Sequence, residues 1–198
     1  MVLKKKFNIY FFVIILSFVN TSLIASPKEF IAKLTSDAST VLASEVDKNE
    51  KMTRLIELAE NNVDIDGIGM YSLGKYRKSL SEDQAKEYEN LFRRYFLKSF
   101  SSRLSEYSDP KINVLSEEVI NEKYTIVFSV LEANEKRPEI KIDWRVYTVN
   151  PDKLLVRDLI IEGLSLARTQ REEFRSIIQN NDGKIQVLFS NLESFIQN

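Results

Sequence analysis

Residues that could perform chemistry are few in this chain of 198 residues, which contains no histidine and no cysteine. Their absence excludes imidazole bases, thiol nucleophiles, disulfides, haem attachment and zinc sites built from these residues. Asp64 and Asp66 stand two positions apart, on different sides of a helix, so we interpret them as residues of a helix start. Ser165 follows Gly163 outside any G-x-S-x-G pattern, and we expect it to cap the next helix. The sequence therefore indicates no catalytic centre.

The strongest remaining pattern is aromatic. Phe92, Tyr95, Phe96 and Phe100 recur at three- and four-residue steps, which places them on one face of a helix. Such a face either belongs to a filled core or lines a cavity for an apolar ligand, and periodicity does not distinguish the two. A dedicated nucleic-acid binder is not indicated, because 28 basic residues are balanced by 29 acidic ones.

The first 25 residues have the three parts of a secretory signal peptide. Lys4–Lys6 form a basic region, a short apolar stretch runs from Phe7 to Val19, and small residues lead to Ala25. The apolar stretch is short for a transmembrane span. Removal of residues 1–25 takes away three lysines and no acidic residue, so the net charge changes from −1 to −4. We therefore expect a cleaved signal peptide, a single domain over residues 26–198 and a periplasmic location.

The mature chain is expected to run through helices, then strands, then helices. Ser81 and Gln84 form a capping-box pattern that predicts one long helix from Ser81 to about Glu106. After Pro110 the apolar period changes to two, which predicts strands over residues 111–116, 124–131, 140–149 and 154–161. Helical periodicity returns after Gly163. This order predicts an α+β fold with a curved four-stranded antiparallel sheet packed against several helices.

Two segments resemble the MlaC family, also known as toluene-tolerance or periplasmic phospholipid-binding proteins. Residues 73–84 (LGKYRKSLSEDQ) and the aromatic helix behind them are similar to one family pattern, and residues 156–166 (VRDLIIEGLSL), through Arg171 and Phe174, to a second. Between these segments, Trp144 and Arg145 match a W-R pair in the family. One departure is Arg77, which stands where many members have tryptophan.

The resemblance implies a non-enzymatic carrier that moves phospholipids between the outer and inner membranes and maintains the lipid asymmetry of the outer membrane. Its implied partners are phospholipid, an outer-membrane lipoprotein–porin complex and an inner-membrane MCE-domain ABC transporter complex. No cofactor is implied, because the bound phospholipid is cargo. The implied fold encloses an apolar pocket for the acyl chains and leaves the headgroup largely in solvent.

Two sets of residues are the candidates for this function. Large apolar side chains on the expected inner faces are assigned to the lipid pocket: Met70, Leu73, Phe92, Tyr95, Phe96, Phe100, Ile142, Trp144, Val146, Ile160, Phe174 and Ile178. Basic side chains expected around the pocket mouth are assigned to headgroup or partner contact: Lys75, Arg77, Lys78, Arg145 and Arg157.

Three alternatives remain open on the sequence. The same fold could carry another lipid, such as a polyprenoid or a quinone. An exported hydrolase or isomerase on a cone-shaped fold is disfavoured by the lack of histidine. A structural adaptor would fill the cavity with its own side chains.

Overall fold

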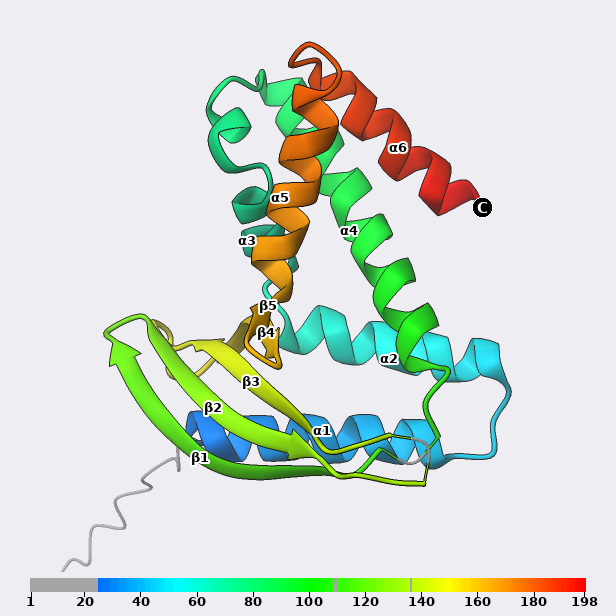
Figure 1. Ribbon diagram of the computed structural model, residues 1–198, viewed down its shortest axis with the longest axis vertical. Helices are drawn as coiled ribbons and strands as arrows, with labels where there is room; N and C mark the ends of the chain where they lie inside the picture. The colour runs from blue at the N-terminus through cyan, green and yellow to red at the C-terminus, as the bar shows by residue number, and fades with distance from the viewer. Residues whose placement is uncertain (1–24, 109, 136) are drawn as a thin grey trace, which may run out of the picture.

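The computed structural model describes residues 25–108, 110–135 and 137–198, so the expected signal peptide lies outside the described residues except for Ala25. The elements, in chain order, are α1 (Pro27–Ala43), α2 (Lys48–Asn62), α3 (Ile65–Ser72), the 3₁₀ helix η1 (Gly74–Lys78), α4 (Glu82–Leu104), β1 (Ile112–Asn121), β2 (Tyr124–Leu131), β3 (Ile140–Tyr147), β4 (Leu155–Ile161), β5 (Leu164–Ser165), α5 (Leu166–Gln179) and α6 (Ile185–Gln197). Helices α3 to α6 gather at one end of the molecule, and the sheet lies with α1 and α2 at the other (Figure 1).

Short polar side chains cap the starts of helices α1 to α5. The hydroxyl of Ser81 accepts a hydrogen bond from the Gln84 amide, and the Gln84 side chain accepts one from the Ser81 amide, so the predicted capping box is confirmed. Ser26 and Glu29 form a second capping box at the start of α1. Asp64 caps α3 by accepting from the Gly67 amide, as expected. These bonds satisfy amides that would otherwise lack partners within the helix.

The sheet is antiparallel throughout, with strands in the order β1-β2-β3-β4-β5. The α+β prediction is confirmed, but the sheet has five strands rather than four, because the two-residue β5 pairs with the end of β4. Glu162 and Gly163 join these strands with φ of 49° and 82°. A two-residue turn with both φ values positive suits the twist of antiparallel strands. β1 extends to Asn121, five residues beyond the predicted end.

A β-bulge at Arg157 changes which residues share a face of the sheet. Arg145 lies opposite Asp158, but Val146 lies opposite Val156, so Arg157 is an extra residue in β4. Because of this insertion, Asp158 points to the opposite face of the sheet from Val156, although regular alternation would place them together.

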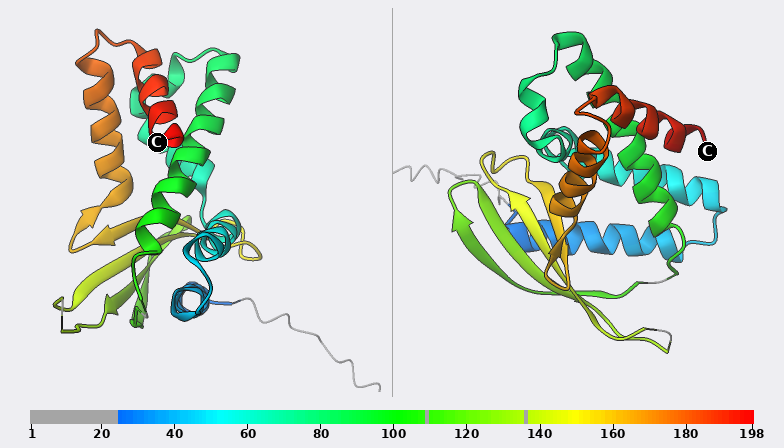
Figure 2. Two further views of the ribbon diagram at one scale, coloured as in Figure 1. Left: turned by 90° about the vertical axis from the view of Figure 1, so that its right-hand side faces the viewer. Right: turned by 45° about the horizontal axis from the view of Figure 1, so that its top comes forward.

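Most of the buried apolar residues form two clusters, at the two ends of the molecule. The helical cluster joins α3, α4, α5 and α6, with Tyr88, Phe92, Phe174 and Phe189 among its largest members. The sheet cluster packs Ile31 of α1 against strands β2, β3 and β4, along which α1 runs (Figure 2). Val63, between α2 and α3, packs against both clusters.

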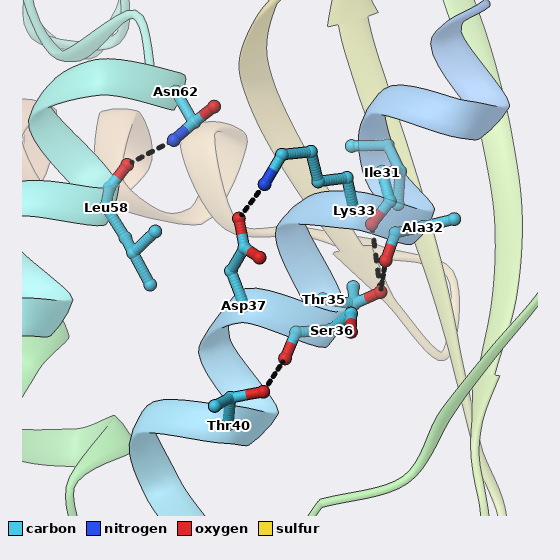
Figure 3. A network of polar contacts seen from close by, with 9 residues as sticks. All are labelled: Ile31, Ala32, Lys33, Thr35, Ser36, Asp37, Thr40, Leu58 and Asn62. Atoms are coloured by element: carbon cyan, nitrogen blue, oxygen red, sulfur yellow. Dashed lines mark hydrogen bonds and ion pairs between the residues drawn. The ribbon is translucent and has the colours of Figure 1, made fainter.

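Polar side chains along α1 bond mainly within their own helix. Thr35 is buried, and its hydroxyl donates to the carbonyls of Ile31 and Ala32 (Figure 3). Lys33 and Asp37 form an ion pair at 2.6 Å on the side of α1 that faces α2 (Figure 3).

Among the described residues, none of the helices is both long enough and apolar enough to cross a membrane.

Candidate functional site

The long helix α4 carries a continuous row of aromatic rings, here called the aromatic ladder: Tyr88, Phe92, Phe96 and Phe100. Successive ring centroids lie 5.7, 6.1 and 5.8 Å apart, because residues four positions apart share one helix face. Tyr88 and Phe92 are buried at 0% and 2% exposure, whereas Phe96 and Phe100 are only half-buried. The ladder therefore leads from the closed helical cluster to a partly open apolar end.

Most of the assigned pocket residues from the helices do meet one another. The Phe174 ring of α5 meets the Phe92 ring edge to face, with centroids 6.2 Å apart, and also contacts Tyr95. The helical cluster and its margin contain the assigned residues Met70, Leu73, Phe92, Tyr95, Phe96, Phe174 and Ile178, and Phe100 joins them through its stacked contact with Phe96.

The assigned residues of β3 lie in the sheet cluster or beside it. Val146 is fully buried there, and Trp144 packs on the cluster while its indole nitrogen donates to the Ser129 hydroxyl at 2.9 Å. Ile142 lies opposite Ser129, on the same face as Trp144, and is half-buried. The sheet thus contributes a half-exposed apolar pair, Ile142 and Trp144, whose polar atom is already bonded.

The prediction that Ile160 shares this face is wrong. Ile160 lies opposite Asp143, and residues directly opposite in an antiparallel pair share a face. The bulge at Arg157 is the physical reason, because it inverts the alternation for the rest of β4. Leu159 takes the expected place, opposite Trp144 and packed on the sheet cluster.

The hydroxyls of Tyr88 and Tyr95 in the helical cluster are both hydrogen-bonded within the protein. Tyr88 donates to the Gly69 carbonyl at 2.9 Å, and Tyr95 donates to the Gln170 side chain at 2.9 Å. Burial raises the pKa of Tyr88 and of Tyr95 above the ordinary tyrosine value of 10.0. Both therefore stay neutral at physiological pH and contribute apolar surface.

Asp158 forms the most buried charged contact of the sheet, with a side chain only 1% exposed. Its carboxylate accepts from the Ser165 hydroxyl at 2.6 Å and from the Ala167 amide at 3.0 Å, and Arg145 lies 3.4 Å away. Ser165 also accepts from the Arg168 amide and so caps α5, as expected. Asp158 and Ser165 therefore have structural contacts, joining the last strands to α5.

The assigned basic residues divide into two groups. Arg145 and Arg157 are held by acidic partners: Arg145 by Asp158, and Arg157 by Asp64 at 2.5 Å. Arg157 also donates to the Tyr124 hydroxyl and lies 4.3 Å from the centre of the Tyr147 ring. Burial lowers the pKa of Arg157, but the hydrogen bond and charge of Asp64 outweigh burial and raise it overall. The second group, Lys75, Arg77 and Lys78, is exposed on η1, and no described carboxylate pairs with it.

Two hollows flank helix α5. The larger, of about 540 Å³, is lined by polar side chains such as Arg168, Thr169 and Glu172. The smaller, of about 140 Å³, lies between η1 and α5 and shares only Leu73 with the assigned pocket. Within the described ranges, no three acidic side chains come close enough to hold a metal ion. The described residues thus offer the apolar surface of the ladder and two hollows beside α5.

Comparison with known protein families identifies the family to which the chain belongs. The family model described as MlaC protein matches residues 28–194. The chain belongs to the MlaC family. A solved structure of the phospholipid-binding protein from Ralstonia solanacearum, in complex with a phospholipid, has the same fold with a TM-score of 0.73. The two are 16% identical, and the match covers 87% of this chain and 98% of that one. No curated protein matches the chain.

Sequence patterns missed two residues that pack on these clusters. Leu159 was missed because alternation without a bulge assigns it to the wrong face. Val63 was missed because it stands between two helices, outside any periodic run, although it packs on both clusters. Its position directly before Asp64, a helix-capping residue, was the available signal.

Proposed function

We propose that this protein is a non-enzymatic phospholipid carrier of the periplasm, with the acyl chains held against the open end of the aromatic ladder. The observation that carries the proposal is the change in exposure along α4, from buried Tyr88 and Phe92 to half-buried Phe96 and Phe100. Membership in the MlaC family and the phospholipid held by the Ralstonia solanacearum protein support it.

Apolar contact alone supplies the binding energy that such a carrier needs. Each buried methylene contributes about 0.8 kcal/mol, so two chains of ~16 carbons represent a gross gain on the order of 20 kcal/mol. Phe96, Phe100, Ile142 and Trp144 expose the apolar surface that would be covered. The headgroup phosphate gains little from burial without a paired cation and stays in water.

The wider role in the proposal is transfer between membranes in an Mla-type system. The protein would receive phospholipid from an outer-membrane lipoprotein–porin complex and exchange it with an inner-membrane MCE-domain ABC transporter complex. Exposed Arg77 and Lys78 at the end of η1 are proposed partner contacts. Charge reversal at both positions is expected to slow transfer between purified partners, and unchanged rates across salt concentrations would remove them from this role.

A periplasmic location requires that the signal peptide be removed. Cleavage near Ala25 would leave Ser26, the N-cap of α1, at or close to the new N-terminus. N-terminal analysis of mature protein is expected to begin near Ser26, and recovery of Met1 would contradict the proposed processing.

The lipid site is tested by two matched substitutions on one sheet. Ile142 and Ile160 are both half-buried isoleucines, but they lie on opposite faces. Ile142→Trp adds bulk to the face that carries Trp144 and is expected to reduce co-purified lipid, as measured by native mass spectrometry. Ile160→Trp is the control and is expected to leave the lipid content unchanged. Both variants should keep a melting temperature near that of the parent.

Val146→Trp provides the comparison for a filled core. Val146 is 0% exposed, so the added bulk forces the sheet cluster apart and is expected to cost about 1–3 kcal/mol or more. Equal lipid content in the Ile142→Trp and Ile160→Trp proteins would overturn the proposed site. A prenyl lipid in place of a diacyl lipid in the parent protein would instead identify a carrier of another lipid, and empty protein would support a structural role.

A further inference from the structure

A small notch between η1 and the middle of α5 has the chemistry of an oxyanion site. Its volume is about 140 Å³, and its polar lining comes from Gly74, Lys75, Arg171, Glu172 and Arg175. Its lining residues belong to η1 and α5 or directly precede η1, whereas Ile142 and Trp144 stand on β3. The notch therefore lies apart from Ile142 and Trp144, which belong to the proposed lipid site.

Arg171 is held in a defined position at this notch. Its guanidinium lies over the Tyr71 ring, 5.1 Å from the ring centre. Gly74 approaches it closely with φ of +56°, and a β-carbon at this position would lie 3.0 Å from the Arg171 Nε. Within the described chain, no carboxylate forms an ion pair with Arg171. A fixed, unpaired guanidinium presents a planar set of donors that suits phosphate or carboxylate oxygens.

The charges around the notch are unbalanced. Lys75, Arg171 and Arg175 line it together, against the single carboxylate of Glu172, which lies 3.4 Å from Arg175. Arg77 and Lys78 follow on η1 and add two exposed positive charges nearby. This concentration stands out in a chain whose net charge is −1. The local field therefore favours an anion at this place.

We propose that the notch binds the phosphate of an anionic phospholipid headgroup at a membrane surface. The volume suits a phosphate group and is too small for acyl chains. Exposed Tyr71, which is 37% exposed beside Arg171, adds the amphipathic aromatic side chain that favours a membrane interface. The inference goes beyond the proposed carrier function, because it concerns a lipid that stays in the membrane and not the cargo.

Two probes separate the possible sources of the phosphate. Inorganic phosphate is titrated into isotope-labelled protein, and the amide signals of Gly74 and Lys75 and the Nε signal of Arg171 are followed by NMR. Vesicles of phosphatidylglycerol, with phosphatidylcholine vesicles as the uncharged comparison, are used in co-sedimentation at low and high salt. We expect phosphate to shift these signals, and the protein to sediment with phosphatidylglycerol vesicles at low salt only.

Arg171→Gln is expected to weaken binding to phosphatidylglycerol vesicles at least about tenfold. Arg168→Gln is the matched control, because Arg168 lies one turn earlier on α5 and lines the other hollow. Lys75→Gln is a second variant on an exposed position and should weaken binding even if Arg171→Gln fails to fold. Equal losses in the Arg168 and Arg171 variants would overturn the site, as would the absence of binding to both probes.

Phosphate shifts without vesicle binding would overturn the membrane assignment. Co-purified lipid is measured in the same samples and is expected to stay at the parent level in Arg171→Gln. Failure of the notch is thus distinguishable from failure of the carrier function, which would appear as absent cargo in the parent protein.

Discussion

Replacement of Ser165 by alanine removes two interactions with one oxygen atom. The hydroxyl caps α5 by accepting from the Arg168 amide at 3.0 Å, a contact that typically contributes about 1 kcal/mol. It also donates to the buried Asp158 carboxylate at 2.6 Å, and a hydrogen bond to a charged group contributes about 1.5–3 kcal/mol. We therefore expect Ser165→Ala to lower the free energy of unfolding by about 3 kcal/mol, more than the cap alone would predict.

Urea unfolding followed by the fluorescence of Trp144, the single tryptophan, measures this loss directly. Ser81→Ala is the matched control, because Ser81 caps α4 in a capping box but is exposed and bonds no buried acid. Its expected cost is about 1 kcal/mol. In a protein that already carries Asp158→Asn, Ser165→Ala should lower the free energy of unfolding by less than it does in the parent protein. If Ser165→Ala is no more destabilising than Ser81→Ala, the assigned contribution of Asp158 is refuted.

Three further predictions concern single positions. Gly69→Ala should destabilise by about 1–3 kcal/mol in thermal unfolding despite better helix propensity, because the new β-carbon would lie 2.7 Å from the Phe92 ring. Tyr88→Phe should cost about 1 kcal/mol in the same assay through its bond to the Gly69 carbonyl. Burial raises the pKa of Asp143 above 3.8, so Asp143→Asn should be more stable than the parent at pH 7. That advantage should disappear as the pH falls below 3.8, and its persistence in acid would contradict the burial effect.

Features that depend on local sequence were predictable. The Ser81 capping box, the strand over residues 124–131 and the cap at Ser165 each depend on neighbouring residues, and each is confirmed. The aromatic ladder was also visible, because its four-residue spacing is a property of one helix. The change in exposure along the ladder was not predictable, because the exposure of each ring depends on where α5 and α6 cover α4.

Features that depend on pairing between distant segments were not predictable. The bulge at Arg157 moves Asp158 to the face of Arg145 and removes Ile160 from the face of Trp144. An arginine at position 157 does not by itself indicate a bulge in the sequence. The partners of Arg157, which are Asp64 and Tyr124, are far away in the chain. The two-residue β5 is too short for any periodicity. The notch brings η1 together with α5, and these two elements are separated in the sequence by the whole sheet.

The division into two clusters also predicts an order of folding. Each of the four long strands pairs with its neighbour in the chain, so the sheet can form before the C-terminal helices dock. The helical cluster is built from segments that lie before and after the sheet in the sequence. Phe92 packs against Phe174 and Tyr88 packs against Phe189, so these contacts form only when the C-terminal helices are in place. Until α5 and α6 dock, Phe92 and Tyr88 lack the cover of Phe174 and Phe189, although α2 and α3 already contact α4. The uncovered rings favour aggregation or chaperone binding. Slow steps in refolding should therefore report the closure of the helical end and not the formation of the strands.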